Sequence, residues 1–249
     1  MGPGGNGLAG HAASSGCIAL VAVEHRQVAL RHRHITPALG VIGHLVGARL
    51  LQAQVLARLA EVQGVPGKAH VGEMAAAKTN LERADRLLIG LTGQRPDDWA
   101  WRRDLGRVRY LLALVAGARD NDPARELTLA REAEQQLQRA LDRAIAAHPT
   151  PRERAEIEVL LTSARLTQSD AHKARNEHAP AAEIQQREEA RLLALPEPVR
   201  AAMEFEYQSG RPAMLLGDSL YYLDRRDEAL AAYRRATARF AEGLRRSSR

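Results

Sequence analysis

The sequence predicts an all-α protein made of antiparallel helix pairs. Its composition favours helices, because 45% of the 249 residues are hydrophobic but only 4% are aromatic, which leaves alanine and leucine to supply most apolar side chains. From about residue 38, apolar residues also recur three and four positions apart in one stretch after another, with short breaks rich in glycine and proline between them. Both observations indicate consecutive amphipathic helices joined by turns.

Four helices are expected between residues 50 and 149. Apolar stripes mark the first three, at Leu50, Leu51, Val55, Leu56, Leu59 and Val62; at Met74, Ala77, Leu81, Ala84, Leu87, Leu88 and Leu91; and at Trp101, Leu105, Val108, Leu112 and Val115. The turns between them are residues 64–67 and 93–96, and either Asp97 or Asp98 is expected to cap the third helix. A polar stretch at 119–123 precedes the fourth helix, over about 125–147.

Prolines divide the second half of the chain. Pro151 suits the first turn of a fifth helix, whose apolar stripe is Ile157, Leu160, Leu161, Ala164 and Leu166. We expect the polar residues 169–180 to link it to a helix over 181–195, with a short helix over 199–207 after that. A break at 210–212 is then expected to introduce a last pair, over 213–223 and 227–244.

Residues 1–37 differ from the rest of the chain. They hold six glycines before position 17 and carry His25, His32 and His34 among arginines, without helical periodicity. We expect a disordered leader, or an extension upstream of the natural start, ahead of a domain over 38–249. No apolar run here approaches the roughly 20 residues of a membrane helix, and no cationic start marks a signal peptide. The expected location is therefore cytoplasmic.

One spacing recurs in three of the expected second helices: an alanine, a larger residue four positions later, and an alanine three positions after that. The triplets are Ala77, Leu81 and Ala84; Ala133, Leu137 and Ala140; and Ala229, Tyr233 and Ala236. In the last pair, Leu216 and Gly217 precede the triplet. Antiparallel helices approach closely where a small side chain lies at their crossing and a larger one fills the groove beside it. The spacing therefore predicts repeated, closely packed helix pairs.

This pattern resembles the tetratricopeptide repeat (TPR), whose signature is Leu-Gly in the first helix and alanine, a large residue and alanine in the second. The resemblance implies a short right-handed solenoid with units of about 50–96, 98–149 and 210–245, and degenerate helices over 152–209. The first unit departs from the signature, because Ala60 replaces the early glycine. Residues 58–105 are also similar to the repeat arrays that accompany bacterial serine/threonine protein kinases or winged-helix regulators. The chain would then be the sensor or scaffold portion of a signalling protein without its effector domain.

No catalytic motif accompanies the repeats. The chain lacks the glycine-rich loop and the His-Arg-Asp and Asp-Phe-Gly segments of a kinase, and residues 64–68 are too short for a phosphate-binding loop. Adjacent carboxylates such as Glu188 and Glu189 are expected on charged, solvent-facing helix sides. His32 and His34 of the leader have no carboxylate or cysteine nearby to complete a metal site. We predict a protein that is not an enzyme and that uses neither a cofactor nor a metal.

The resemblance implies that the first helix of each pair lines a concave groove for a partner protein or peptide. The family's groove positions fall on Arg103, Arg107, Tyr110, Arg211, Met214, Asp218, Tyr221 and Tyr222. Because arginine binds carboxylates bidentately and tyrosine offers a rigid contact surface, we expect an acidic partner segment. The alternative for Tyr221 and Tyr222 is that they only seal the last helix pair.

Nucleic-acid binding is a competing hypothesis, because the formal net charge is +6. Acidic residues are spread through the same helices, so that no helix concentrates positive charge on one side. A protein or peptide partner is therefore the favoured expectation.

Overall fold

The computed structural model describes residues 44–67 and 69–247, which are helices joined by turns, with no strand among them. The all-α prediction is confirmed for this part of the chain. The chain divides into two units, one that ends at Arg49 and one that begins at Leu50. Of the first unit, residues 44–49 are described, and they are helical. The leader predicted over 1–37 and its boundary with the domain lie outside the described residues.

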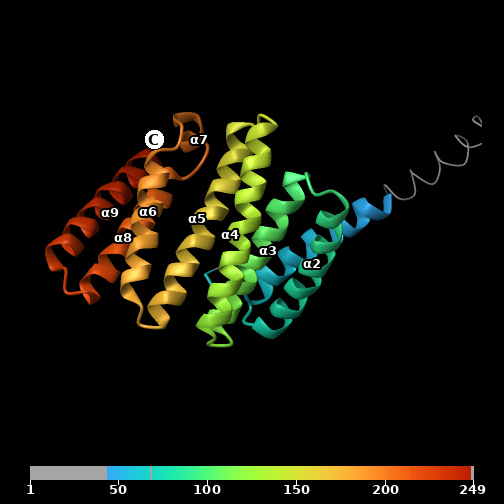
Figure 1. The fold of residues 1–249 in the computed structure, drawn as a ribbon, viewed down its shortest axis with the longest axis horizontal. Helices are drawn as coiled ribbons and strands as arrows, with labels where there is room; N and C mark the ends of the chain where they lie inside the picture. The colour runs from blue at the N-terminus through green and yellow to red at the C-terminus, as the bar shows by residue number, and fades with distance from the viewer. Residues whose placement is uncertain (1–43, 68, 248–249) are drawn as a thin grey trace, which may run out of the picture. The chain divides into compact units, whose positions relative to one another are not determined.

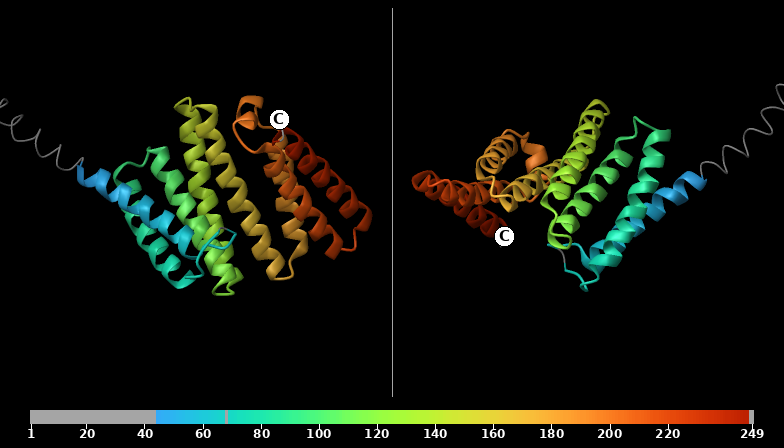
Figure 2. Two further views of the ribbon diagram at one scale, coloured as in Figure 1. Left: turned by 180° about the vertical axis from the view of Figure 1, so that it is seen from behind. Right: turned by 60° about the horizontal axis from the view of Figure 1, so that its bottom comes forward.

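The second unit is a row of helices. It begins with a helix over 50–64, and the helices that follow are α2 (Met74–Gln94), α3 (Trp99–Ala118), α4 (Pro123–Ala146), α5 (Pro151–Ala174), α6 (His178–Leu193), α7 (Glu197–Ala201), α8 (Phe205–Tyr222) and α9 (Arg226–Ser247). From α2 to α6, each helix packs on the next one in the chain, and α6 then packs on α8 and α8 on α9. Figures 1 and 2 show these helices side by side in chain order. The short α7 packs against α5.

Four of the turns between long helices contain one residue with a left-handed backbone. These residues are Asn121, His148, Asn176 and Asp224, with φ between 48° and 61°. Asparagine, aspartate and histidine tolerate this region better than other residues with a side chain, because their short polar groups bond locally. The turns are therefore tight, and each reverses the chain direction between two adjacent helices.

Side-chain caps fix where several helices begin. Asp98 accepts a hydrogen bond from the backbone N–H of Trp101, so it is the second of the two predicted aspartates that caps α3. Thr150 and Glu153 cap α5 reciprocally: the Thr150 hydroxyl accepts from Glu153 N–H (3.2 Å), and the Glu153 carboxylate accepts from Thr150 N–H (2.9 Å). Such a box satisfies two backbone donors that the first turn of a helix otherwise leaves without partners.

Three predicted boundaries are wrong. The polar stretch 169–180 is not a linker, because α5 continues to Ala174 and α6 begins at His178. The short helix predicted over 199–207 is instead α7, which ends at Ala201. Residues 210–212 do not separate two helices, because α8 starts at Phe205 and runs through them. At Gly210 the reason is close packing: a Cβ there would lie 2.5 Å from Cε1 of Phe240 on α9.

The predicted small-and-large packing is visible at two helix pairs. A Cβ on Gly106 of α3 would lie 2.6 Å from Cγ of Leu137 on α4, and one on Gly217 of α8 would lie 2.6 Å from Cε1 of Tyr233 on α9. The large residue of each second helix therefore lies directly over the glycine of the first. The alanines of all three triplets are at most 3% exposed.

The two kinds of helix glycine should respond oppositely to alanine. Gly106→Ala should lower the free energy of unfolding by about 1–3 kcal/mol, because its methyl group collides with Leu137. Gly90→Ala, in α2 with no atom within 4 Å of its would-be Cβ, should raise it by about 0.5–1 kcal/mol. Urea unfolding of both variants measures the difference. Equal effects of the two substitutions would contradict the close approach of α3 and α4.

Candidate functional site

A cavity of about 460 Å³ lies along the first helices of three successive pairs. The helix over 50–64, α3 and α5 contribute most of its lining, and the turn after α7 adds Ala202 and Met203. We call this cavity the central groove. It contains three of the predicted site residues, Arg103, Arg107 and Tyr110. Whether they bind a partner stays a prediction.

Ion pairs cross the central groove from one helix to the next. Arg107 Nη2 on α3 lies 2.5 Å from Glu61 Oε1 on the helix over 50–64. Arg103 Nη2 lies 2.9 Å from Asp104 Oδ1, and its Nη1 lies 3.3 Å from Glu156 Oε2 on α5. The predicted arginines are therefore matched by carboxylates of the same chain, and the lining is not the basic surface that the sequence led us to expect. A sequence pattern places Arg103 and Arg107 on a helix face, but not opposite the carboxylates of other helices.

Tyr110 connects the central groove to α8. Its side chain packs, partly buried, against an apolar cluster of α4 and α5 that includes Leu137 and Leu161. Burial raises the pKa of the phenol, while the positive charge of Arg211 and the side chain of Ser163 act in the opposite direction. Arg211 of α8 also has its guanidinium 5.8 Å from the ring centroid of Tyr207, within the range of a cation–π contact. One of the predicted α8 residues is thus close enough to Tyr110 to act on it.

The other predicted residues of α8 serve different surroundings. Asp218 accepts a hydrogen bond from the Tyr233 hydroxyl at 2.7 Å, so it holds α9 to α8. Tyr222 stacks on His178 of α6 with ring centroids 4.5 Å apart. Met214 and Tyr221 are 39% and 60% exposed. The structure thus brings Arg211 towards the α3 residues, but gives Asp218 and Tyr222 contacts within their own part of the row.

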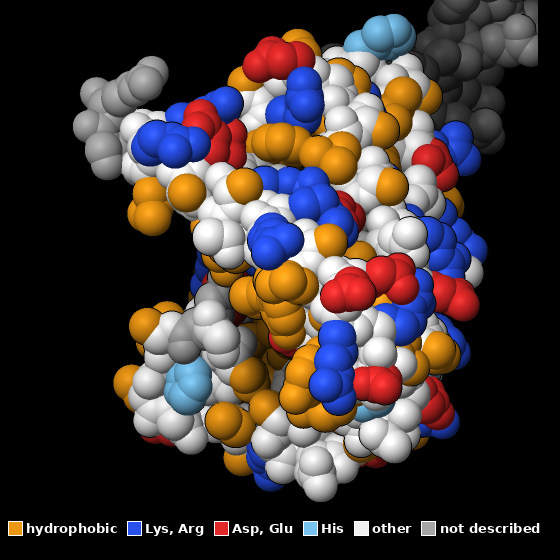
Figure 3. Space-filling view, turned by 90° about the vertical axis from the view of Figure 1, so that its left-hand side faces the viewer, with side chains coloured by type: hydrophobic (Ala, Val, Ile, Leu, Met, Phe, Trp, Pro, Cys, Tyr) orange, Lys and Arg blue, Asp and Glu red, His pale blue; other side chains and the backbone are white. Residues whose placement is uncertain are grey.

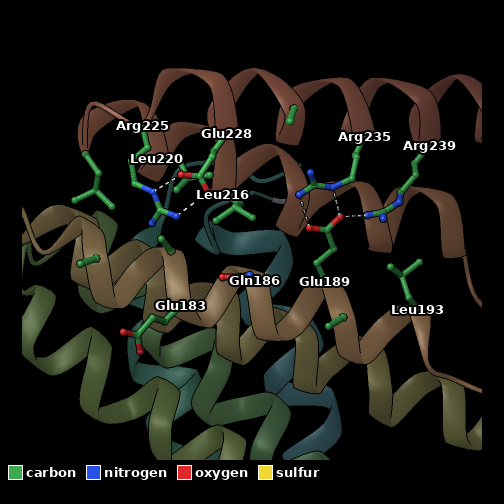
Figure 4. A pocket seen from close by; sticks show the side chains of 15 residues that line it. Glu183, Gln186, Glu189, Leu193, Leu216, Leu220, Arg225, Glu228, Arg235 and Arg239 are labelled. Atoms are coloured by element: carbon green, nitrogen blue, oxygen red, sulfur yellow. Dashed lines mark hydrogen bonds and ion pairs between the residues drawn. The ribbon is translucent and has the colours of Figure 1, made fainter.

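A second cavity, of about 520 Å³, lies between α6 and α9 and has α8 as its floor. Figure 4 shows Arg235 and Arg239 reaching from α9 to Glu189 of α6, beside Leu216 and Leu220. The Glu189 carboxylate accepts from Arg235 Nε and Nη2, both at 3.0 Å, and lies 2.9 Å from Arg239 Nη1. Although burial opposes it, these two arginines hold the pKa of Glu189 below its usual value. We call this cavity the outer groove.

Glu188 and Glu189 are buried, so the prediction that they face solvent is wrong. Glu188 is 1% exposed and lies between α5 and α6 with Glu158, also 1% exposed. Arg191 binds both carboxylates, with Nη2 2.5 Å from Glu188 Oε1, and donates to the Thr162 hydroxyl at 2.9 Å. Burial opposes it, but Arg191 still holds the pKa of Glu188 below its usual value. This cluster joins α5 to α6 through charged hydrogen bonds.

A sequence signal for the buried cluster exists, but it went unrecognised. In α6, Ala181, Gln185 and Glu188 repeat the spacing of four and three residues that marks the other second helices, and all are at most 1% exposed. In this triplet, Gln185 takes the place of the large apolar residue and Glu188 takes the place of the second alanine. The spacing therefore indicates the buried face of α6, whereas the polar residue types favour a position facing solvent.

Glu126 is a buried carboxylate whose pKa is raised, unlike those of Glu188 and Glu189. It lies at the start of α4 over Gly117 of α3, is 8% exposed, and has the charge of Asp170 on α5 as a further electrostatic neighbour. Burial, with a smaller contribution from Asp170, raises the pKa of Glu126 to about 7. The carboxyl therefore changes its charge near neutral pH.

Two further features concern the described part of the chain. It holds no group of three or more histidine, cysteine, aspartate or glutamate side chains placed to bind a metal. None of its helices combines the length and the apolar character that crossing a membrane requires. The leader residues Cys17, His25, His32 and His34 lie outside it.

Replacing Glu126 should make stability less sensitive to pH. Between pH 4.5 and 7 the unfolded chain releases a proton that folded Glu126 retains, so this residue lowers stability as the pH rises. Glu126→Gln should raise the free energy of unfolding at pH 8 by up to about 3 kcal/mol, and by much less at pH 5. Urea unfolding at both pH values measures this. A gain that is the same at pH 5 and pH 8 would show that the carboxyl does not titrate in this range.

The buried cluster should be sensitive to loss of its cation. Arg191→Met removes the guanidinium that Glu158 and Glu188 share, while Arg154 stays 3.3 Å from Glu158 and Arg165 stays 3.1 Å from Glu188. It should lower the free energy of unfolding by about 1–3 kcal/mol. Arg187→Met is the matched control, because Arg187 lies one turn earlier in α6 and pairs with Glu183 where both side chains are more than 70% exposed. That substitution should change stability by less than about 1 kcal/mol. Similar losses in both variants would contradict a specific role for Arg191.

Comparison with known proteins adds no family to this description. No protein-family model and no curated protein matches the chain. The resemblance to tetratricopeptide repeats therefore depends on the residues and on how they pack.

Proposed function

We propose that this protein is a non-catalytic scaffold that binds a partner protein or peptide in the central groove of a TPR-like solenoid. The observation that carries the proposal is that the first helices of three successive pairs line one cavity of about 460 Å³. Grooves of this kind recognise extended or helical segments of other proteins.

The packing of the helix pairs supports a TPR-like arrangement. Gly106 lies under Leu137 and Gly217 under Tyr233, which are the two places where Leu-Gly in a first helix meets the central residue of a triplet. The same packing at separate points of the chain is what a repeated structural unit predicts. It leaves the first helices side by side with their outer faces available.

The groove favours a partner of mixed character over a simply acidic one. Arg58 and Glu156, on the two outer helices of the three, have side chains that are 71% and 49% exposed. Val159, Leu160 and Met203 provide apolar lining, and none of them is fully exposed. A segment with apolar residues between an acidic and a basic side chain would satisfy both sets of contacts. An acidic segment alone would compete with the carboxylates that already pair with Arg103 and Arg107.

The same ion pairs weaken the case for nucleic acid. Binding to phosphates depends on releasing counterions from unneutralised cations. Arginines in the central groove are instead paired with Glu61, Asp104 and Glu156. We therefore keep the protein or peptide partner as the proposed function.

Peptide selection tests the proposal. Peptides are selected from a random displayed library on the full-length protein at about 0.15 M salt, and the affinity of the enriched peptides is measured for variants. Arg58→Ala combined with Glu156→Ala, in the central groove, should weaken binding by at least about tenfold. Arg225→Ala combined with Glu228→Ala is the matched control, because it removes an exposed ion pair (2.7 Å) from the outer groove.

The control variant should bind within about threefold of the parent, because it leaves the central groove intact. If the control loses binding and the central-groove variant retains it, the site is the outer groove and the proposed site is wrong. Failure to select any peptide, or selection of peptides that bind both variants equally, would also contradict the proposal.

A further inference from the structure

The row of helices has exposed apolar side chains at both of its ends. On the helix over 50–64, Leu51, Val55, Leu59 and Val62 are between 45% and 62% exposed, and we call this stripe the leading edge. At the other end, Met214 and Tyr221 of α8 and Leu230 of α9 are between 39% and 60% exposed, and we call them the trailing edge. Figure 3 looks onto the end that α8 and α9 form and shows hydrophobic side chains exposed across it, beside a hollow. A solenoid whose ends face water normally has polar terminal surfaces.

The leading edge consists of positions that are buried elsewhere in the row. Counted from the small residue that follows the leucine, Leu59 and Val62 occupy the positions of Leu216 and Ser219 in α8. Those two residues are 4% and 0% exposed. Leu216 belongs to an apolar cluster with Ala182 of α6, which is the second helix of the preceding pair. The helix over 50–64 is therefore built to receive such a helix on its exposed side.

The trailing edge includes positions that contact the following helix pair elsewhere in the row. Met214 and Tyr221 of α8 occupy the positions that Arg103 and Tyr110 hold in α3. In α3 both residues reach the first helix of the next pair, α5: Arg103 pairs with Glu156 at 3.3 Å, and Tyr110 packs against an apolar cluster that includes Ile157 and Leu161 of α5. No next pair follows α9 within the described residues, and α8 presents these positions to solvent.

Both edges lack an ion pair that joins neighbouring helix pairs inside the row. Inside the row, Arg109 of α3 pairs with Asp85 of α2 at 3.1 Å across the contact between one pair and the next. The equivalent of Arg109 on the helix over 50–64 is Gln63, and the equivalent of Asp85 on α9 is Thr237. The leading edge therefore lacks the arginine of this ion pair, and the trailing edge lacks its aspartate. Two edges that both lack this ion pair can meet without leaving either of its charges buried and without a partner.

We propose that copies of this chain stack head to tail, with the leading edge of one copy against the trailing edge of the next. The contact would reproduce the arrangement between neighbouring pairs inside the chain. Because the two edges are different surfaces, the interface is heterologous, and it extends in one direction from copy to copy. This inference does not depend on the function proposed for the central groove.

Sedimentation velocity on the full chain tests the proposal over about a hundredfold range of concentration. Average mass should rise with concentration and should persist in about 0.5 M salt, because the edges are apolar. Leu59→Glu at the leading edge and Leu230→Glu at the trailing edge should each give a monomer, since every contact needs one of each edge. An equal mixture of the two variants should form a dimer through the one pair of intact edges that remains.

Ile89→Glu is the matched control, because Ile89 is a 46% exposed aliphatic residue on α2 that belongs to neither edge. It should assemble like the parent, and circular dichroism should show all variants to be equally helical. A parent chain that stays monomeric at every concentration overturns the proposal. So does self-association of Leu230→Glu alone, which would indicate a symmetric contact between two leading edges.

Discussion

The close approach of paired helices at small residues is the constraint on which the rest of this structure depends. Leu137 over Gly106 and Tyr233 over Gly217 bring each second helix against the backbone of its first helix. That approach turns one side of each first helix inward and leaves the opposite side available. The central groove follows from it, because Arg103, Arg107 and Tyr110 lie on the side of α3 that is left available.

The pair of α5 and α6 meets the same constraint with different chemistry. Ala181, Gln185 and Glu188 keep the spacing of the other second helices, but the large residue is an amide and the last small residue is a carboxylate. Burying Glu188 requires a cation, and Arg191 of the same helix supplies it while also binding Glu158 of α5. The two helices thus stay paired where the alanine and the large apolar residue of the other triplets are absent. At these positions a charged cluster takes the place of the apolar side chains, and Arg154 and Arg165 of α5 also pair with its carboxylates.

The fold could be predicted from the sequence to the extent that it depends on local periodicity. The stripes of α2, α3 and α5, Asp98 as a cap and the buried triplets all follow from patterns within one helix or one turn. The stripe predicted at 50–62 does mark a helix, but Leu51, Val55, Leu59 and Val62 are exposed and Ala53, Ala57 and Ala60 form the buried side. The start of α8 could not be predicted in this way, because Gly210 normally marks a break and only Phe240, thirty residues later, explains why it lies inside a helix. The prediction of a basic groove is wrong for the same reason, because Arg107 is neutralised by Glu61, which is far from it in sequence. Position on a helix face is local information, whereas partners across helices are not.

The central groove and the two edges are related through the first helices that form both. Tyr110 and Tyr221 occupy equivalent positions, yet Tyr110 is partly buried against α4 and α5 and Tyr221 is 60% exposed. If a second copy covered the trailing edge, Met214 and Tyr221 would acquire the surroundings that Arg103 and Tyr110 have within the chain. The groove of one copy would then continue into the next, because first helices would follow one another without interruption. Self-assembly would thereby lengthen the binding surface rather than obstruct it, and a partner that spans two copies would gain affinity from both.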